Sequence, residues 1–110
     1  MKPENLLIGQ DGYIRLTDFG ISKLFDPENG NDTSGTPGYM APEVMLREAH
    51  GVAADYYGLG ICLYELVEGQ RPFHGKSRKE IKKLIMTHRP KLRKHHKFSQ
   101  DCIDFVNQLL

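Results

Sequence analysis

Residues 53–69 constrain the fold of this chain most, because they predict a helix with almost no polar face. Its apolar side chains are Tyr56, Tyr57, Leu59, Ile61, Cys62, Leu63, Tyr64, Leu66 and Val67, and Gly69 is a natural C-cap. A helix that is apolar all round is normally buried on every side. A chain of 110 residues buries only roughly two thirds of its unfolded surface. We therefore expect this chain to be part of a larger domain.

The residues before this helix predict a short hairpin and a loop. Residues 6–8 and 13–16 are short apolar runs, and Asp11-Gly12 between them is a strong turn signal. From residue 25 to residue 38 the composition changes to Pro, Gly, Asn, Asp, Ser and Thr. Such a composition is typical of a loop whose ends are better defined than its middle.

Two amphipathic helices are expected after the apolar one. Ser77 and Glu80 form a capping-box pattern, which predicts a helix over residues 77–88 with Pro90 after its end. Ser99 can cap a second helix. Its apolar face comprises Cys102, Ile103, Val106, Leu109 and Leu110, so it continues to the last residue. Cys62 and Cys102 lie in these apolar patterns, which indicates buried free thiols rather than a disulfide.

Charge is divided along the chain, although the net charge is only +1. Residues 1–75 carry five Lys or Arg against eleven Asp or Glu, whereas residues 76–97, from Lys76 to Lys97, carry ten against Glu80 alone. This basic segment has no interleaved aromatic residues, so we expect no nucleic acid partner. It is predicted to be a solvated helix and loop, with a docking surface for an acidic partner as the alternative.

The hydropathy pattern sets the expected location. No apolar run reaches the 18 or so residues of a membrane span, and the N-terminus lacks the layout of a signal peptide. We therefore expect no membrane span and an intracellular protein, with the cytoplasm as the first expectation.

Four motifs follow one another in a fixed order. They are Lys2-Pro3-Glu4-Asn5, then Asp18-Phe19-Gly20 with Asp18 13 positions after Asn5, then Gly35-Thr36-Pro37-Gly38-Tyr39, and Met40-Ala41-Pro42-Glu43. This series resembles the second half of a eukaryotic protein kinase domain. The first motif and Thr36 resemble Ser/Thr kinases, and residues 32–43 and 71–76 resemble the AGC group. The resemblance implies a mainly α fold: a kinase C-lobe portion with one small β-hairpin, an activation loop, and helices F, G and the start of H.

The resemblance implies an ATP and Mg²⁺ site. Asn5 and Asp18 match the two residues that bind magnesium in kinases, and Lys2 matches the catalytic-loop lysine near the transferred phosphate. Leu7 lies where these enzymes rest the adenine ring. Thr36 matches a threonine that bonds to the catalytic aspartate and lysine.

Substrate and regulatory sites are implied in the same way. Glu4 and Glu65 fall where AGC kinases hold arginines of the substrate, which implies basic protein substrates; a plain helix-surface charge is the alternative for Glu65. The usual activation-loop phosphothreonine is replaced by Asp32, which Lys23 would face. Thr33 and Ser34 are alternative phosphorylation sites or plain loop hydroxyls.

The remaining matches are structural. Phe19 and Gly20 complete the Asp-Phe-Gly motif. Asp55 matches the residue that tethers the catalytic loop, and Glu43 matches a residue paired with an arginine beyond this chain. We expect both carboxylates to be buried without partners, which is costly.

Residues 1–110 are therefore predicted to be a partial kinase domain. In the kinase pattern the catalytic aspartate falls one position before Met1, and the Gly-rich loop and strand lysine precede it. We expect the complete protein to transfer the ATP γ-phosphoryl group to Ser or Thr, and the isolated chain to be inactive. The alternative is a non-catalytic kinase-like module that docks partners through the basic helix G region, residues 76–97.

Overall fold

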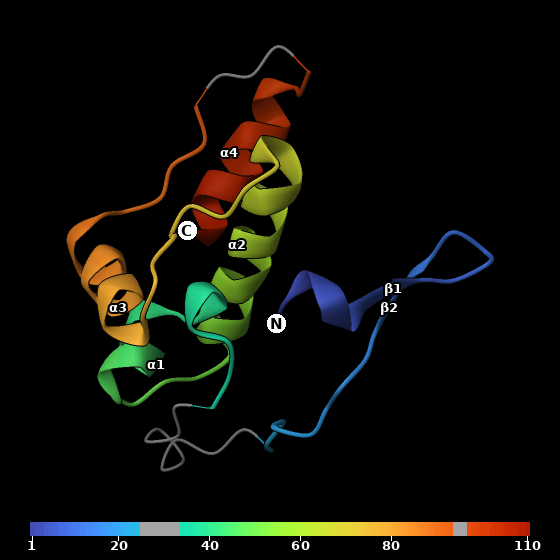
Figure 1. The fold of residues 1–110 in the computed structure, drawn as a ribbon. Coiled ribbons are helices and arrows are strands. Elements are labelled where there is room, and N and C mark those ends of the chain that lie inside the picture. The colour runs from blue at the N-terminus through green and yellow to red at the C-terminus, as the bar shows by residue number, and fades with distance from the viewer. Residues whose placement is uncertain (25–33, 94–96) are drawn as a thin grey trace.

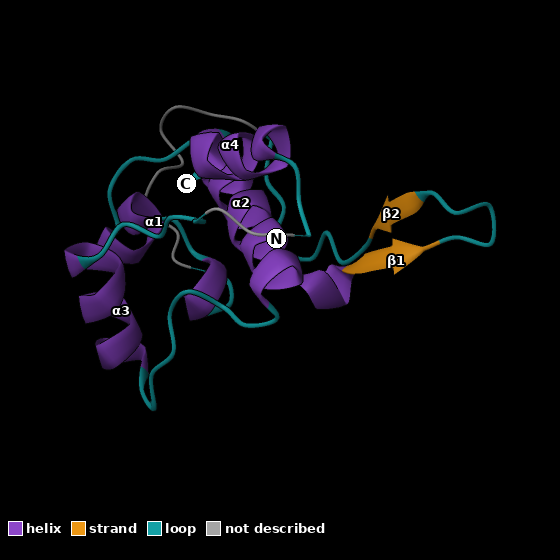
Figure 2. Ribbon diagram, turned by 90° about the horizontal axis from the view of Figure 1, so that it is seen from above, coloured by secondary structure: helices purple, strands orange, loops and turns teal. Residues whose placement is uncertain are grey.

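The computed structural model describes residues 1–24, 34–93 and 97–110. Within them a small hairpin extends from a group of four α-helices, and the N-terminal turn lies between the two parts (Figures 1 and 2). The predicted mainly helical fold with one hairpin is confirmed.

The hairpin pairs β1 (Leu6–Ile8) with β2 (Ile14–Leu16) in antiparallel register, Leu7 opposite Arg15. The turn between them is closed by hydrogen bonds from the Gly9 amide to the Tyr13 carbonyl, at 2.8 Å, and from the Gly12 amide to the Gly9 carbonyl, at 2.9 Å. Tyr13 was predicted to lie in the second strand, but it belongs to the turn. A short 3₁₀ turn, η1 (Pro3–Asn5), leads into β1.

Helix α2 (Ala53–Glu68) forms the centre of the helical part and ends at Gly69 in the left-handed conformation, as predicted. One of its faces packs against α4 (Gln100–Leu109), whose N-cap is Ser99. A Cβ atom at Gly60 would lie 2.9 Å from the Leu109 Cβ atom, so the glycine lets α4 approach closely. Leu92, Ile103 and Val106 are buried between these helices and the preceding loop.

The larger core joins α2 to segments that precede it and follow it in the chain. The 3₁₀ turn η2 (Pro37–Tyr39) contacts α2 and α3 (Arg78–Thr87), and the five-residue helix α1 (Pro42–Leu46) packs on α3. Its buried members include Tyr39, Met40, Tyr57, Ile61 and Phe73. Neither α1 nor η2 was predicted, since segments this short carry no recognisable periodicity.

Helix α2 is not buried on every side. Tyr56 is 59% exposed and Leu66 is 66% exposed, so apolar surface is open at both ends of the helix, as expected for a helix that a chain of this size cannot surround. The cysteines are both free, and Cys62 is fully buried, but Cys102 is only half-buried, which corrects the prediction of two buried thiols. None of the helices in the described ranges is both long and apolar enough to cross a membrane.

Candidate active site

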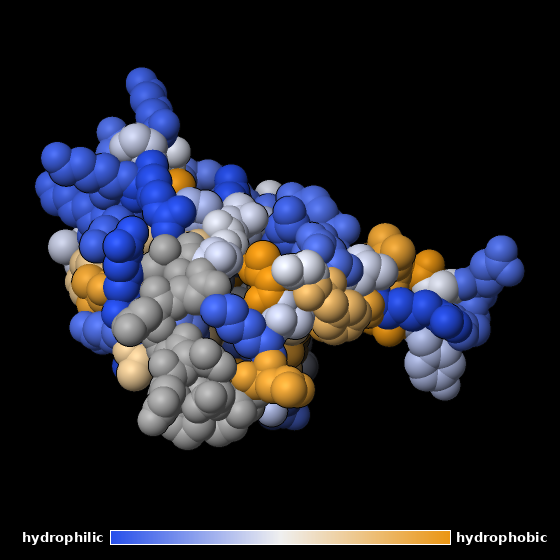
Figure 3. Space-filling view, turned by 90° about the horizontal axis from the view of Figure 1, so that it is seen from below, coloured by the Kyte–Doolittle hydropathy of each residue, from blue (hydrophilic) through white to orange (hydrophobic). Residues whose placement is uncertain are grey.

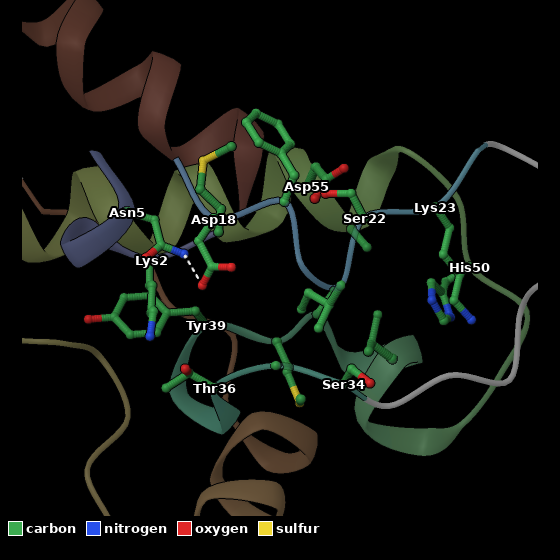
Figure 4. A pocket seen from close by; sticks show the side chains of 18 of the residues that line it. Lys2, Asn5, Asp18, Ser22, Lys23, Ser34, Thr36, Tyr39, His50 and Asp55 are labelled. Atoms are coloured by element: carbon green, nitrogen blue, oxygen red, sulfur yellow. Dashed lines mark hydrogen bonds between the residues drawn. The ribbon is translucent and has the colours of Figure 1, made fainter. Parts of the chain in front are cut away.

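A cleft of about 590 Å³ lies where the residues after the hairpin face the helical part. Its walls come from three parts of the chain: the N-terminal turn, the segment that follows β2, and the residues around η2 and the start of α2. Figure 4 shows Lys2, Asn5, Asp18 and Tyr39 at one end of this cleft and Lys23 and His50 at the other. The first three of these come from the two motifs at the N-terminus.

Backbone and side-chain hydrogen bonds hold Asn5 and Asp18 near each other. The Thr17 amide and hydroxyl both donate to the Asn5 carbonyl oxygen, at 2.9 and 3.2 Å. The next residue, Asp18, has a left-handed backbone with φ of 61°, which aspartate tolerates better than most residues. Its Oδ1 accepts from the Gly20 amide at 3.3 Å, and Asn5 Nδ2 donates to its Oδ2 at 3.5 Å.

This pair has the chemistry of a magnesium site. Mg²⁺ prefers hard oxygen ligands and is commonly held by one or two protein side chains together with substrate phosphates. Asn5 offers its Oδ1 atom, and Asp18 offers a carboxylate that is exposed to the cleft. The oxygen atoms of these two residues are therefore of the kind that Mg²⁺ prefers.

Lys2 and Thr36 line the same cleft as this pair. Leu7, predicted to support the adenine ring, lies on the hairpin outside the cleft lining and is 52% exposed. Phe19 is 63% exposed beside Asp18 and Gly20.

Lys23 and Ser34 also line the cleft, whereas Asp32 and Thr33 lie outside the described residues. His50 joins them there, and its Nδ1 atom lies 3.0 Å from the Glu48 carbonyl oxygen. Sequence reasoning missed His50, because it belongs to no recognised motif and its loop before α2 carries no pattern.

A second group of charged residues surrounds Tyr39. The Tyr39 hydroxyl donates to Glu65 Oε2 at 2.5 Å, and the guanidinium of Arg71 lies over the Tyr39 ring. Burial first, and then the hydrogen bond and the charge of Glu65, raise the pKa of Tyr39 well above its usual range. The charge of Glu4 acts in the same direction, so the two predicted substrate-binding carboxylates both influence one hydroxyl group.

The expectation of two buried, unpartnered carboxylates is wrong. Asp55 is exposed at the start of α2, Glu43 is half-buried, and no charged side chain is buried in the ranges that the structure describes. Water can solvate both groups, so the predicted desolvation cost does not arise. Glu43 still acts on its surroundings: burial and, second, the Glu43 charge raise the pKa of Tyr57 to about 12.

Comparisons with known proteins agree with the motifs. The family model of the protein kinase domain matches residues 1–110. The chain is 43% identical over 88 residues to human ribosomal protein S6 kinase alpha-1, covering 78% of this chain and 12% of that protein. It is 38% identical over 110 residues to a Caenorhabditis elegans cAMP-dependent protein kinase catalytic subunit-like protein, covering 100% of this chain and 27% of that protein. The chain thus spans between about an eighth and about a quarter of the length of these relatives. It belongs to the protein kinase family, as an AGC-like Ser/Thr kinase sequence.

Proposed function

We propose that this chain is the catalytic-loop and lower part of a Ser/Thr protein kinase that transfers the γ-phosphoryl group of ATP to protein hydroxyls. The observation that carries the proposal is the Asn5 and Asp18 pair, joined across 3.5 Å at the end of a cleft that Lys2 and Thr36 also line. Mg²⁺ bound there neutralises charge on the nucleotide phosphates.

The other residues have roles that follow from charge and position. Lys2 places a cation at the cleft, where it offsets negative charge that develops on the transferred group. Thr36 orients the catalytic loop, and Leu7 supports the adenine ring when an upper lobe covers the hairpin. Glu4 and Glu65 favour basic substrates, because their carboxylates attract arginine or lysine. Lys23, at the far end of the cleft, is proposed to face Asp32, which stands in for the activation-loop phosphothreonine. Thr33 and Ser34 are alternative phosphorylation sites.

In this proposal residues 1–110 are a partial domain, in which α2, α3 and α4 correspond to kinase helices F, G and the start of H. The complete protein supplies the catalytic aspartate, the Gly-rich loop and the strand lysine, and it acts in the cytoplasm. The 110-residue chain is then inactive by itself, because it has neither a roof for the nucleotide nor a carboxylate to orient the acceptor hydroxyl.

A phosphotransfer assay tests the proposal. The complete protein encoded by the gene is incubated with labelled ATP, Mg²⁺ and a basic serine peptide, beside the 110-residue chain. We expect transfer by the complete protein, loss of transfer of at least about a hundredfold in Asp18→Ala, and no transfer by the chain alone. Asp104→Ala, which changes an exposed carboxylate on α4, should leave transfer unchanged. A complete protein that transfers nothing, or whose activity survives Asp18→Ala, contradicts the proposal.

The basic surface of α3 favours a second candidate, a non-catalytic docking module. Lys76, Lys79, Lys82 and Lys83 are all exposed on or beside this helix. A surface of one charge steers an oppositely charged partner. In this case the isolated chain binds an acidic protein with an affinity that falls steeply with salt, and a charge-reversed Lys79→Glu/Lys83→Glu chain does not bind. Salt-independent binding would count against this candidate.

A further inference from the structure

The surface around Tyr39 already carries an arginine. Arg71 lies just after the end of α2, and its guanidinium carbon is 5.5 Å from the centroid of the Tyr39 ring. A guanidinium at this distance is attracted by the negative face of the ring. Tyr39 is 6% exposed and Arg71 is half-buried, so the cation lies on a ring that is largely removed from water.

The surface around Tyr39 also carries negative charge. The Tyr39 hydroxyl donates to Glu65 Oε2 at 2.5 Å, and Glu65 is half-buried on α2. Burial raises the pKa of Tyr39 most, Glu65 and Glu4 raise it further, and Arg71 lowers it. Two carboxylates and one guanidinium of this chain therefore act on one tyrosine.

Gly38 provides the room for the guanidinium. A Cβ atom at this position would lie 2.8 Å from Arg71 Nη1, which is closer than side chains normally approach. Gly38 is not among the residues with positive φ, so its backbone accepts an alanine. An alanine there would therefore displace the guanidinium, which is the flexible end of its side chain.

We propose that Arg71 is a specificity-determining residue, whose guanidinium takes the position on the ring of Tyr39, the residue bonded to Glu65, that an arginine of the substrate needs. This inference rests on the proposed function, in which Glu4 and Glu65 hold basic side chains of the substrate. Two guanidinium groups cannot share one ring face, and their like charges repel each other. The consequence is a kinase with a reduced preference for arginine upstream of the phosphorylated residue.

The preference is reduced rather than abolished. Arg71 and Glu65 form no ion pair within 4.0 Å, so Arg71 is not held to Glu65 by a salt bridge. A substrate arginine can compete for the carboxylate if Arg71 moves off the ring. Removing Arg71 should therefore increase the preference for an upstream arginine, which the carboxylates of Glu4 and Glu65 support.

Matched peptides measure this preference in the complete kinase. They carry arginine or citrulline, its neutral isostere, at each position upstream of the acceptor serine in turn. Arg71→Gln should raise the ratio of kcat/KM for the arginine peptide to that for the citrulline peptide by about threefold to tenfold. The change should lie in KM rather than in kcat, because Arg71 acts on binding.

Further variants distinguish an effect of the Arg71 charge from an effect of a disturbed fold. Gly38→Ala keeps Arg71 but displaces its guanidinium, so it should also raise the ratio of kcat/KM for the arginine peptide to that for the citrulline peptide. Arg71→Lys keeps a cation at this position, so its ratio should stay near that of the wild type. Adding Glu65→Gln to Arg71→Gln should remove the gain. Arg89→Gln is the matched control, since Arg89 is exposed beyond α3 and lines a different pocket.

The outcomes distinguish this inference from the proposed function. An active kinase whose ratio stays unchanged in both Arg71→Gln and Gly38→Ala overturns the role of Arg71. Failure of the wild type to phosphorylate any peptide overturns the proposed function instead. In that case fluorescence anisotropy with peptides that carry alanine at the acceptor position still compares binding of arginine and citrulline. Equal binding of the two by Arg71→Gln then overturns the inference as well.

Discussion

Tyr39 connects the larger core with Glu65, one of the two residues proposed to bind the substrate. Its ring belongs to the larger core, and its hydroxyl donates to Glu65 at 2.5 Å. We expect Tyr39→Phe to lower the free energy of unfolding by about 1 kcal/mol, because a hydrogen bond to a charged acceptor is lost while half-buried Glu65 regains some water. Urea unfolding followed by circular dichroism measures this change. The control is Tyr13→Phe on the hairpin, where the side chain is 75% exposed and the expected change is within about 0.5 kcal/mol. Equal effects of the two variants would contradict the role given to this hydrogen bond.

Tyr57 gives the chain a predictable response to alkaline pH. Burial and the nearby Glu43 charge raise its pKa from 10.0 to about 12. Above pH 10 the unfolded chain releases this proton while the folded chain retains it, so the unfolded state binds fewer protons and stability falls as pH rises toward 12. Stability measured from pH 8 upward should therefore decline less in Tyr57→Phe than in the wild type, and Tyr13→Phe should follow the wild type. Identical pH profiles for Tyr57→Phe and the wild type would show that Tyr57 does not retain its proton in the fold.

Helix α3 depends on its N-terminal cap. Ser77 Oγ accepts from the Glu80 amide at 3.2 Å, and Glu80 Oε2 accepts from the Lys76 amide at 2.7 Å, one residue earlier than in a standard capping box. We expect Ser77→Ala to lower the free energy of unfolding by about 1 kcal/mol and Ser77→Gly by only a few tenths. Thermal unfolding of the two variants side by side checks this. Equal losses would mean that the serine oxygen does not cap the helix.

Elements with local signals could be predicted from the sequence. The Asp11-Gly12 turn, the caps at Ser77 and Ser99 and the C-cap at Gly69 all depend on residues close together in the chain. The contact of Tyr39 with Glu65 joins residues 26 positions apart, and the stacking of Arg71 is equally non-local, so neither follows from a local pattern. Uncovered apolar surface on α2 was expected from its composition, but not that Tyr56 and Leu66 would carry it, because periodicity shows which residues are apolar and not what covers each of them. The Asn5 and Asp18 pair was predicted only through the kinase resemblance. The structure adds that the two side chains lie within 3.5 Å of each other.

In the part of the chain that the structure describes, several large apolar side chains are exposed. The hairpin and the segment after it expose Ile8 at 78%, Ile14 at 69% and Leu24 at 91%, and Figure 3 shows apolar surface along this side of the chain. Leu66 and Tyr56 add apolar surface on α2. Large exposed apolar side chains favour association, so the chain should be marginally stable or oligomerise.

Sedimentation velocity over a range of protein concentrations tests the central proposal, that α2 and the hairpin are inner elements of a larger kinase domain. We expect the 110-residue chain to associate increasingly as its concentration rises, and the complete kinase domain to sediment as a monomer throughout. The double variant Ile8→Lys/Ile14→Lys, which places charges on the exposed hairpin, should weaken association of the chain. A chain that remains monomeric at every concentration and melts in one sharp transition would contradict the claim, because the elements described would then form a complete core by themselves.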